Sequence, residues 1–142
     1  MAITYKYSVM CDQVRREDNG KWLLLGVYED SMGLPQLPTP LPGLTFFMRL
    51  ESDRLGVWNA RVRLEHLESG RKLFEGMAIL NFQRPGSGMV PVPTPPFQID
   101  SVGVYNFVME IQGQEHDPII HPFSVVLNTQ RPPVGGQPNQ MR

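Results

Sequence analysis

Two histidines near the C-terminal end, His116 and His121, are the residues that most readily suggest chemistry. With Glu115 and Asp117 beside them they could bind zinc or iron, because imidazole and carboxylate groups are good ligands for these metals. The spacing argues against a site, since two residues five positions apart on an extended strand point to opposite faces. Nearby prolines restrict bending except through a loop. We therefore expect a polar turn here and no bound metal.

The single cysteine, Cys11, precedes Asp12, which could suggest a nucleophile with an acidic neighbour. Adjacent strand residues face opposite ways, and alternation places Cys11 on the same face as Tyr7 and Val9. We interpret it as a buried, unreactive thiol. His66 is the remaining histidine, and nothing local pairs with it. Because glycine-rich phosphate motifs and G-x-S-x-G are also missing from the sequence, we predict no catalytic, cofactor-binding or metal residue.

The composition indicates one domain with many turns. A chain of 142 residues can bury a core without disulfides or metal, and its 14 prolines and 13 glycines favour extended connections. The net charge of −1, with interspersed signs, gives no basic field for nucleic acid. No apolar run approaches the roughly 20 residues that span a bilayer, and the first residues do not resemble a signal peptide. With only one cysteine, these features lead us to expect a cytoplasmic protein that does not bind membranes.

Side chains alternate in character along most of the chain, which predicts β-strands. Residues 3–11 form a half-buried strand with Ile3 and each odd residue up to Cys11 on the core face. A turn at residues 18–20 leads into residues 22–28, whose almost unbroken apolar run is typical of a strand covered on both faces. Further strands are expected at residues 44–51, 56–67 and 72–82. In the second of these, the residues predicted to face the core are Trp58, Ala60, Val62 and Leu64.

Two proline-rich segments, residues 31–43 and 84–96, separate these strands. Proline lacks an amide donor and has a fixed φ, so we predict long connections in both places. The P-x-x-P spacing within residues 35–42 and 91–96 could also form a polyproline II ligand for an aromatic groove. Without a flanking Arg or Lys, a rigid crossover between sheets is the favoured interpretation.

The clearest pattern is a predicted hairpin within residues 97–127, with a turn at residues 112–113. Its apolar alternation comprises Tyr105, Phe107, Met109, Ile111, Phe123, Val125 and Leu127. The segment Asp100-x-x-Gly103-x-Tyr105 resembles the tyrosine corner of immunoglobulin-like sandwiches, with its aspartate one residue early. We predict an all-β fold: a single antiparallel β-sandwich over residues 1–127, of immunoglobulin-like or related Greek-key topology. Residues 128–142, mostly polar, Gly or Pro, are predicted to be a disordered tail.

Two stretches carry more specific motifs. The first reads Cys11-Asp12-x-Val14-Arg15-x-Glu17-x-x-Gly20-Lys21 and continues as Leu24-Leu25-Gly26-Val27-Tyr28. The second is the hairpin with Gly103-x-Tyr105-x-Phe107 that ends in Pro122-Phe123-x-Val125. Both resemble a family of short bacterial proteins of unknown function, over most of the chain up to Leu127. The resemblance implies an all-β domain in a bacterial, cytoplasmic setting and assigns no catalytic or binding residue.

A protein–protein interaction or assembly module, binding a protein partner or forming a homo-oligomer, is the function that this sequence favours. Sandwiches expose edge strands and loops, and the tail at residues 128–142 and the loop at residues 31–43 are the expected contact surfaces. One alternative is a metal-dependent hydrolase in which the fold brings His66, His116 and His121 together. Another is a small-ligand-binding sandwich, whose pocket would be lined by Trp22, Trp58 and tyrosines.

Overall fold

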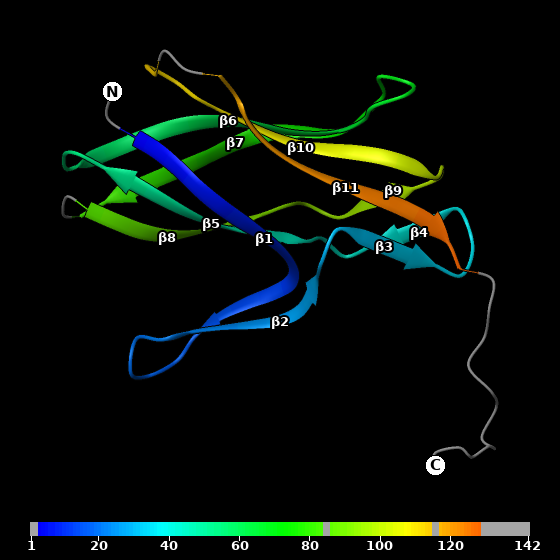
Figure 1. The fold of residues 1–142 in the computed structure, drawn as a ribbon, viewed down its shortest axis with the longest axis horizontal. Coiled ribbons are helices and arrows are strands. Elements are labelled where there is room, and N and C mark those ends of the chain that lie inside the picture. The colour runs from blue at the N-terminus through cyan, green and yellow to red at the C-terminus, as the bar shows by residue number, and fades with distance from the viewer. Residues whose placement is uncertain (1–2, 84–85, 115–116, 129–142) are drawn as a thin grey trace.

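The computed structural model describes residues 3–83, 86–114 and 117–128, which form an all-β domain without a helix (Figure 1). Its strands are β1 (Ile3–Arg16), β2 (Trp22–Tyr28), β3 (Ser31–Leu34), β4 (Thr39–Leu41), β5 (Thr45–Ser52), β6 (Gly56–His66), β7 (Lys72–Phe82), β8 (Gly86–Pro93), β9 (Phe97–Ile99), β10 (Gly103–Ile111) and β11 (Ile119–Leu127). The predicted all-β fold is confirmed. Within this described part, there is no helix long and apolar enough to cross a membrane.

Two main sheets pack face to face. One has four strands in the order β2-β1-β5-β8, and the other has five in the order β3-β11-β10-β6-β7. A small third sheet joins β4 to β9. Neighbouring strands are antiparallel except β3 and β11, which are parallel. The core therefore lies between the four-stranded and five-stranded sheets.

The predicted hairpin, now β10 and β11, supplies the centre of that core. Tyr105 and Phe107 of β10 are fully buried. The Phe107 ring stacks on Phe46 of β5, with the ring centroids 4.0 Å apart. This contact joins the two sheets directly, because β5 and β10 belong to different ones. A period of two placed these aromatic rings on one face, and burial there stabilises the sandwich.

Strand β1 departs from the predicted alternation. Its pairing with β5 shifts register between Tyr5 and Tyr7, the mark of a β-bulge. An extra residue at a bulge reverses which side chains face inward further along. Met10 is consequently in the main core, whereas Tyr7 is exposed. The predicted core face of odd residues is therefore wrong beyond Tyr5, although Cys11 is buried beside β5.

Strand β2 is not covered on both faces, so that prediction is wrong. Among the strands that the structure describes, it pairs only with the C-terminal half of β1 and is therefore an edge strand. The resulting hairpin, residues 12–28, is called the arm here; it curves away from the sandwich and lies below β5 and β8 in Figure 1. Gly26 permits the bend, because its φ is 68° and a Cβ there would overlap the Asp12 carboxylate.

Both proline-rich connections contain strands that were not predicted. Residues 31–43 include β3 and β4, and β8 pairs along the whole of β5 as an edge strand. The prediction of a plain crossing at residues 84–96 is therefore wrong. Proline lacks a donor but is tolerated in a strand that has a neighbour on only one side, which is the position of β8 with Pro91 and Pro93.

Candidate functional site

His66 lies buried at the end of β6, and both of its ring nitrogens have partners. Nε2 is 2.9 Å from the carbonyl oxygen of Val102, and Nδ1 is 2.7 Å from Ser69 Oγ. A carbonyl oxygen only accepts, so Nε2 carries a hydrogen and donates to Val102, while Nδ1 and the Ser69 hydroxyl share the other hydrogen bond. The expectation that nothing local pairs with His66 is thus wrong. A serine three residues further on is within reach because the chain turns immediately after β6.

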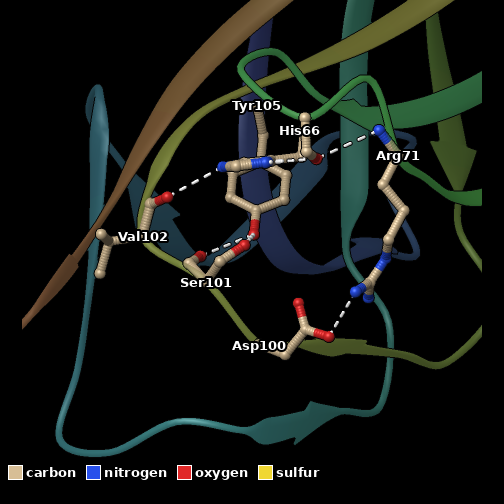
Figure 2. Close-up of polar contacts among 7 residues, drawn as sticks. His66, Arg71, Asp100, Ser101, Val102 and Tyr105 are labelled. Carbon is tan, nitrogen blue, oxygen red and sulfur yellow. Dashed lines mark hydrogen bonds and ion pairs between the residues drawn. The ribbon is translucent and has the colours of Figure 1, made fainter.

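Tyr105 forms the tyrosine corner that its surroundings predict. Its hydroxyl donates to the carbonyl oxygen of Ser101 at 2.6 Å, a few residues upstream (Figure 2). Its ring lies 4.8 Å from that of His66, measured between centroids. Asp100, the aspartate that stands one residue early for this motif, forms an ion pair with Arg71. We call this group of residues the corner cluster: His66, Ser69, Arg71, Asp100, Ser101, Val102 and Tyr105.

The corner cluster joins the turn between β6 and β7 to the connection between β9 and β10. Gly103 allows the close approach, since its φ is 121° and a Cβ would lie 3.0 Å from His66 Nε2. The imidazole nitrogens and the tyrosine hydroxyl are all engaged by groups of the protein itself. The arrangement is therefore one that fixes the fold at this end of the sandwich.

A second polar chain connects the two sheets. Ser8 Oγ lies 2.6 Å from His121 Nδ1 and 2.8 Å from the hydroxyl of Tyr5. The His121 ring meets Phe46 edge-on at 5.3 Å, and burial lowers the pKa of the imidazole below its usual 6.5. Burial therefore favours the neutral form of His121. Sequence reasoning missed Ser8 because the bulge in β1 turns it inward, and its partner is 113 positions away.

A serine hydrogen-bonded to a neutral histidine also occurs in nucleophilic catalytic sites. The surroundings of Ser8 therefore decide whether this pair has a catalytic or a structural role. A hollow of about 570 Å³ is lined by residues 3–5 and 117–120. Neither Ser8 nor His121 lines it. The serine hydroxyl is held from both sides by Tyr5 and His121. The contact is best understood as a link between sheets.

The structure gives the proposed metal ligands separate surroundings. His66 belongs to the corner cluster, and His121 contacts Ser8 of the opposite sheet. His116, with Glu115, lies outside the described residues. Among residues 3–83, 86–114 and 117–128, no group of three His, Cys, Asp or Glu side chains is placed to hold a metal ion. The hydrolase alternative therefore has no assembled ligand set in this part of the chain.

Cys11 has the environment of a structural thiol. It is fully buried, and its Sγ contacts the carbonyl oxygens of Gln13 and Thr45 at 3.5 and 3.6 Å. Burial, and then the charge of Asp12, raise the pKa of the thiol. The reactive thiolate is disfavoured on both counts.

The two tryptophans do not line a common pocket. Trp58 of β6 packs against the core between the sheets. Trp22 of β2 meets Phe47 edge-on at 5.3 Å. Because Phe46 is in the core, its neighbour Phe47 faces the opposite side of the same sheet. The aromatic pocket expected of a small-ligand sandwich is thus not formed by this pair.

Trp22 packs the arm against the sandwich, while other apolar side chains of the arm stay exposed to solvent. The Arg16 guanidinium lies 4.2 Å from the centre of the Trp22 ring, which itself rests on Phe47. Leu23, Leu25 and Val27, at alternate positions of β2, are 40%, 39% and 54% exposed. The arm therefore presents a row of apolar side chains along a strand with one free edge.

A second uncovered apolar group lies on the other sheet, at its edge strand β7. Met77 and Ile79 of β7 and Val57 of β6 are 58%, 69% and 63% exposed. Their cross-strand partners are Arg61, Asn59 and Asn81, which puts all of them on the outer face of the five-stranded sheet. These two apolar surfaces, and no catalytic constellation, are the features of the described residues that point to a function.

The comparison with protein families agrees with the resemblance seen in the sequence. The model of a family of unknown function (DUF6941) matches residues 6–126, so this chain belongs to that family. No curated protein matches the sequence.

Proposed function

We propose that this member of the DUF6941 family is a protein–protein interaction or assembly module that binds a partner protein through its arm. One observation carries the proposal. The apolar run of β2, which would suit a buried strand, is exposed at Leu23, Leu25 and Val27. Contiguous exposed apolar side chains mark sites of association in folded proteins, so a partner is the natural cover for them.

The arm could bind such a partner through both its backbone and its side chains. An extended segment could pair with the free edge of β2 through backbone hydrogen bonds, while its side chains cover the apolar row. Burying the exposed part of each of these side chains would contribute about 1–2 kcal/mol at 25 cal/mol per Å². Trp22 and Phe47 hold the arm against the sandwich, which reduces the entropy lost on binding.

Two further expectations belong to the same proposal. The family resemblance and the sequence composition support a bacterial, cytoplasmic setting with no nucleic-acid or membrane partner. An immunoglobulin-like topology is supported by the tyrosine corner at Tyr105 and by the packing of two mainly antiparallel sheets. Such sandwiches serve many unrelated functions, so the topology adds nothing about the identity of the partner.

The partner can be sought with a photo-crosslinking amino acid at position 25 in the native cell. The matched position is Leu55, which is 57% exposed but lies in the turn between β5 and β6. A protein captured from position 25 and not from position 55 is then purified. Its affinity should fall at least tenfold for Leu25→Lys and stay unchanged for Leu55→Lys. Equal capture at both positions, or equal affinity of both variants, would refute binding through the arm.

A further inference from the structure

The four outer edges of the two main sheets differ in how they are protected against pairing. Strand β8 carries Pro91 and Pro93, β3 is only four residues long, and β2 is bent at Gly26. Prolines, short length and kinks are the usual means of blocking an edge. Strand β7 has none of these. It is 11 residues long, with no charge and no proline from Gly76 to Phe82.

The outer face of β7 is also apolar. Met77 and Ile79 stand two residues apart on the edge strand, and Val57 lies beside them on β6. All three are more than half exposed. In the described residues, β6 is the only strand paired with β7. The strand therefore combines free backbone groups with exposed apolar side chains.

We propose that β7 pairs with β7 of a second copy of this chain, antiparallel and around a two-fold axis at Ala78. This contact between two copies is separate from the contact between the arm and its partner. It rests on the proposed function only in its general part, that the protein acts in protein association. Pairing from Phe74 to Phe82 would join two five-stranded sheets into one continuous sheet. Identical strands related by a two-fold axis are necessarily antiparallel, which is the geometry that an edge strand of an antiparallel pair accepts.

The sequence of β7 is self-complementary in this register. Met77 lies opposite the partner's Ile79, and Ile79 lies opposite the partner's Met77, so that both exposed apolar side chains are covered. The one charged residue in the paired segment, Glu75, lies opposite the partner's Asn81, which leaves no like charges facing each other. On the inner face, the small residues Gly76 and Ala78 lie near the axis.

Neighbouring registers lack these pairings. An axis at Met77 would place Glu75 opposite the partner's Ile79 and leave a charge against an apolar side chain. An axis at Ile79 would place Met77 opposite the partner's Asn81. Only the axis at Ala78 matches the two apolar residues with each other, and this supports a second copy as the occupant of the edge.

Sedimentation velocity of the full chain between about 1 and about 100 μM tests the proposal, because a small interface dissociates in the lower part of this range. The wild-type chain should form dimers as the concentration rises. Met77→Glu with Ile79→Glu should abolish them, since the register sets four carboxylates against one another. Met77→Glu with Ile79→Lys should restore them, since each new carboxylate then faces the partner's new ammonium group.

Met77 and Ile79, the two positions changed in both variants, are solvent-exposed in the monomer, and circular dichroism checks that both chains fold. A monomeric wild-type chain at the highest concentration would overturn the proposal, as would a dimer that survives both glutamates. A dimer that the glutamates break and the lysine does not restore would overturn the axis at Ala78. Leu25→Lys should leave the dimer intact, so that loss of the arm's partner and loss of the dimer are separate results.

Discussion

At the scale of single residues, stability depends on a few side chains that connect the two sheets. Phe46 and Phe107 stack in the core, and Ser8 meets His121 at its margin. The burial of Phe107 was predictable, because a period of two identifies one face of a strand. The Ser8–His121 contact was not, because it depends on a bulge and on a partner far away in sequence. Local sequence patterns reveal neither the bulge nor the distant partner.

Replacing Phe107 with Ala should lower the free energy of unfolding by about 3–5 kcal/mol, because a fully buried ring is lost from the core. Urea denaturation measures the change. Val104→Ala, at a partly exposed position of the same strand, is the control and should cost much less. A loss below about 1 kcal/mol for the Phe107 variant, as at an ordinary surface site, would contradict the stacked core.

His121 should make the protein less stable as the pH falls. Burial lowers the pKa of its imidazole in the folded state below 6.5, so the unfolded chain takes up the proton first. The contribution is fully present above pH 6.5 and is lost as the pH falls through the lower folded-state pKa. Unfolding midpoints in urea across this window, compared with those of His121→Gln, measure it. The same slope in both proteins would show that another group is responsible.

At the scale of elements, the fold depends on where turns and edges lie as well as on alternation. The sequence predicts β6 and β10 well, because each has a regular apolar face, and it also predicts strands at the positions of β7 and β11, although Leu127 of β11 is exposed. It does not predict that β2 is exposed or that β8 is a strand. An apolar run is compatible with burial on two faces or with an uncovered edge, and proline excludes a central strand but not an edge strand. The neighbours of a strand decide between these outcomes.

Gly103→Ala tests how the corner cluster holds β6 and β10 together. The change should destabilise the protein by about 1–3 kcal/mol, because φ is 121° and the new Cβ would press on His66. Gly76→Ala is the matched control, since its Cβ would meet nothing within 4 Å. Thermal unfolding compares the two. Equal stability of both variants would show that the contact between Gly103 and His66 is not tight.

At the scale of the whole molecule, the sandwich presents two apolar surfaces on different sheets, one on the arm and one on β7. A chain with both could bind one protein through the arm and a second copy of itself through β7. This arrangement suits a subunit of an assembly. The sequence indicated a role in association but placed the contacts in the loop at residues 31–43 and in the tail. Within that loop, the structure pairs β3 with β11 and β4 with β9, so much of its backbone is already engaged.

Deleting residues 129–142 tests the remaining part of that expectation. These residues lie outside the described ones, and their composition predicts that they add little to the core. The midpoint of thermal unfolding should stay nearly the same, and self-association or partner recovery should weaken only if the tail is a contact surface as the sequence predicted. Full recovery of every partner would leave the arm and β7 as the contact surfaces, and unfolding of the shortened chain would show that the tail belongs to the domain.

Amide hydrogen exchange of the full chain, with and without the protein captured at position 25, tests binding through the arm most directly. Exchange should slow along β2, where backbone groups at the free edge become hydrogen-bonded and Leu23, Leu25 and Val27 become covered. Exchange along the buried strand β10 should stay the same. Unchanged exchange in β2 at a saturating concentration of the partner would contradict the claim that the exposed arm is the surface through which this protein acts.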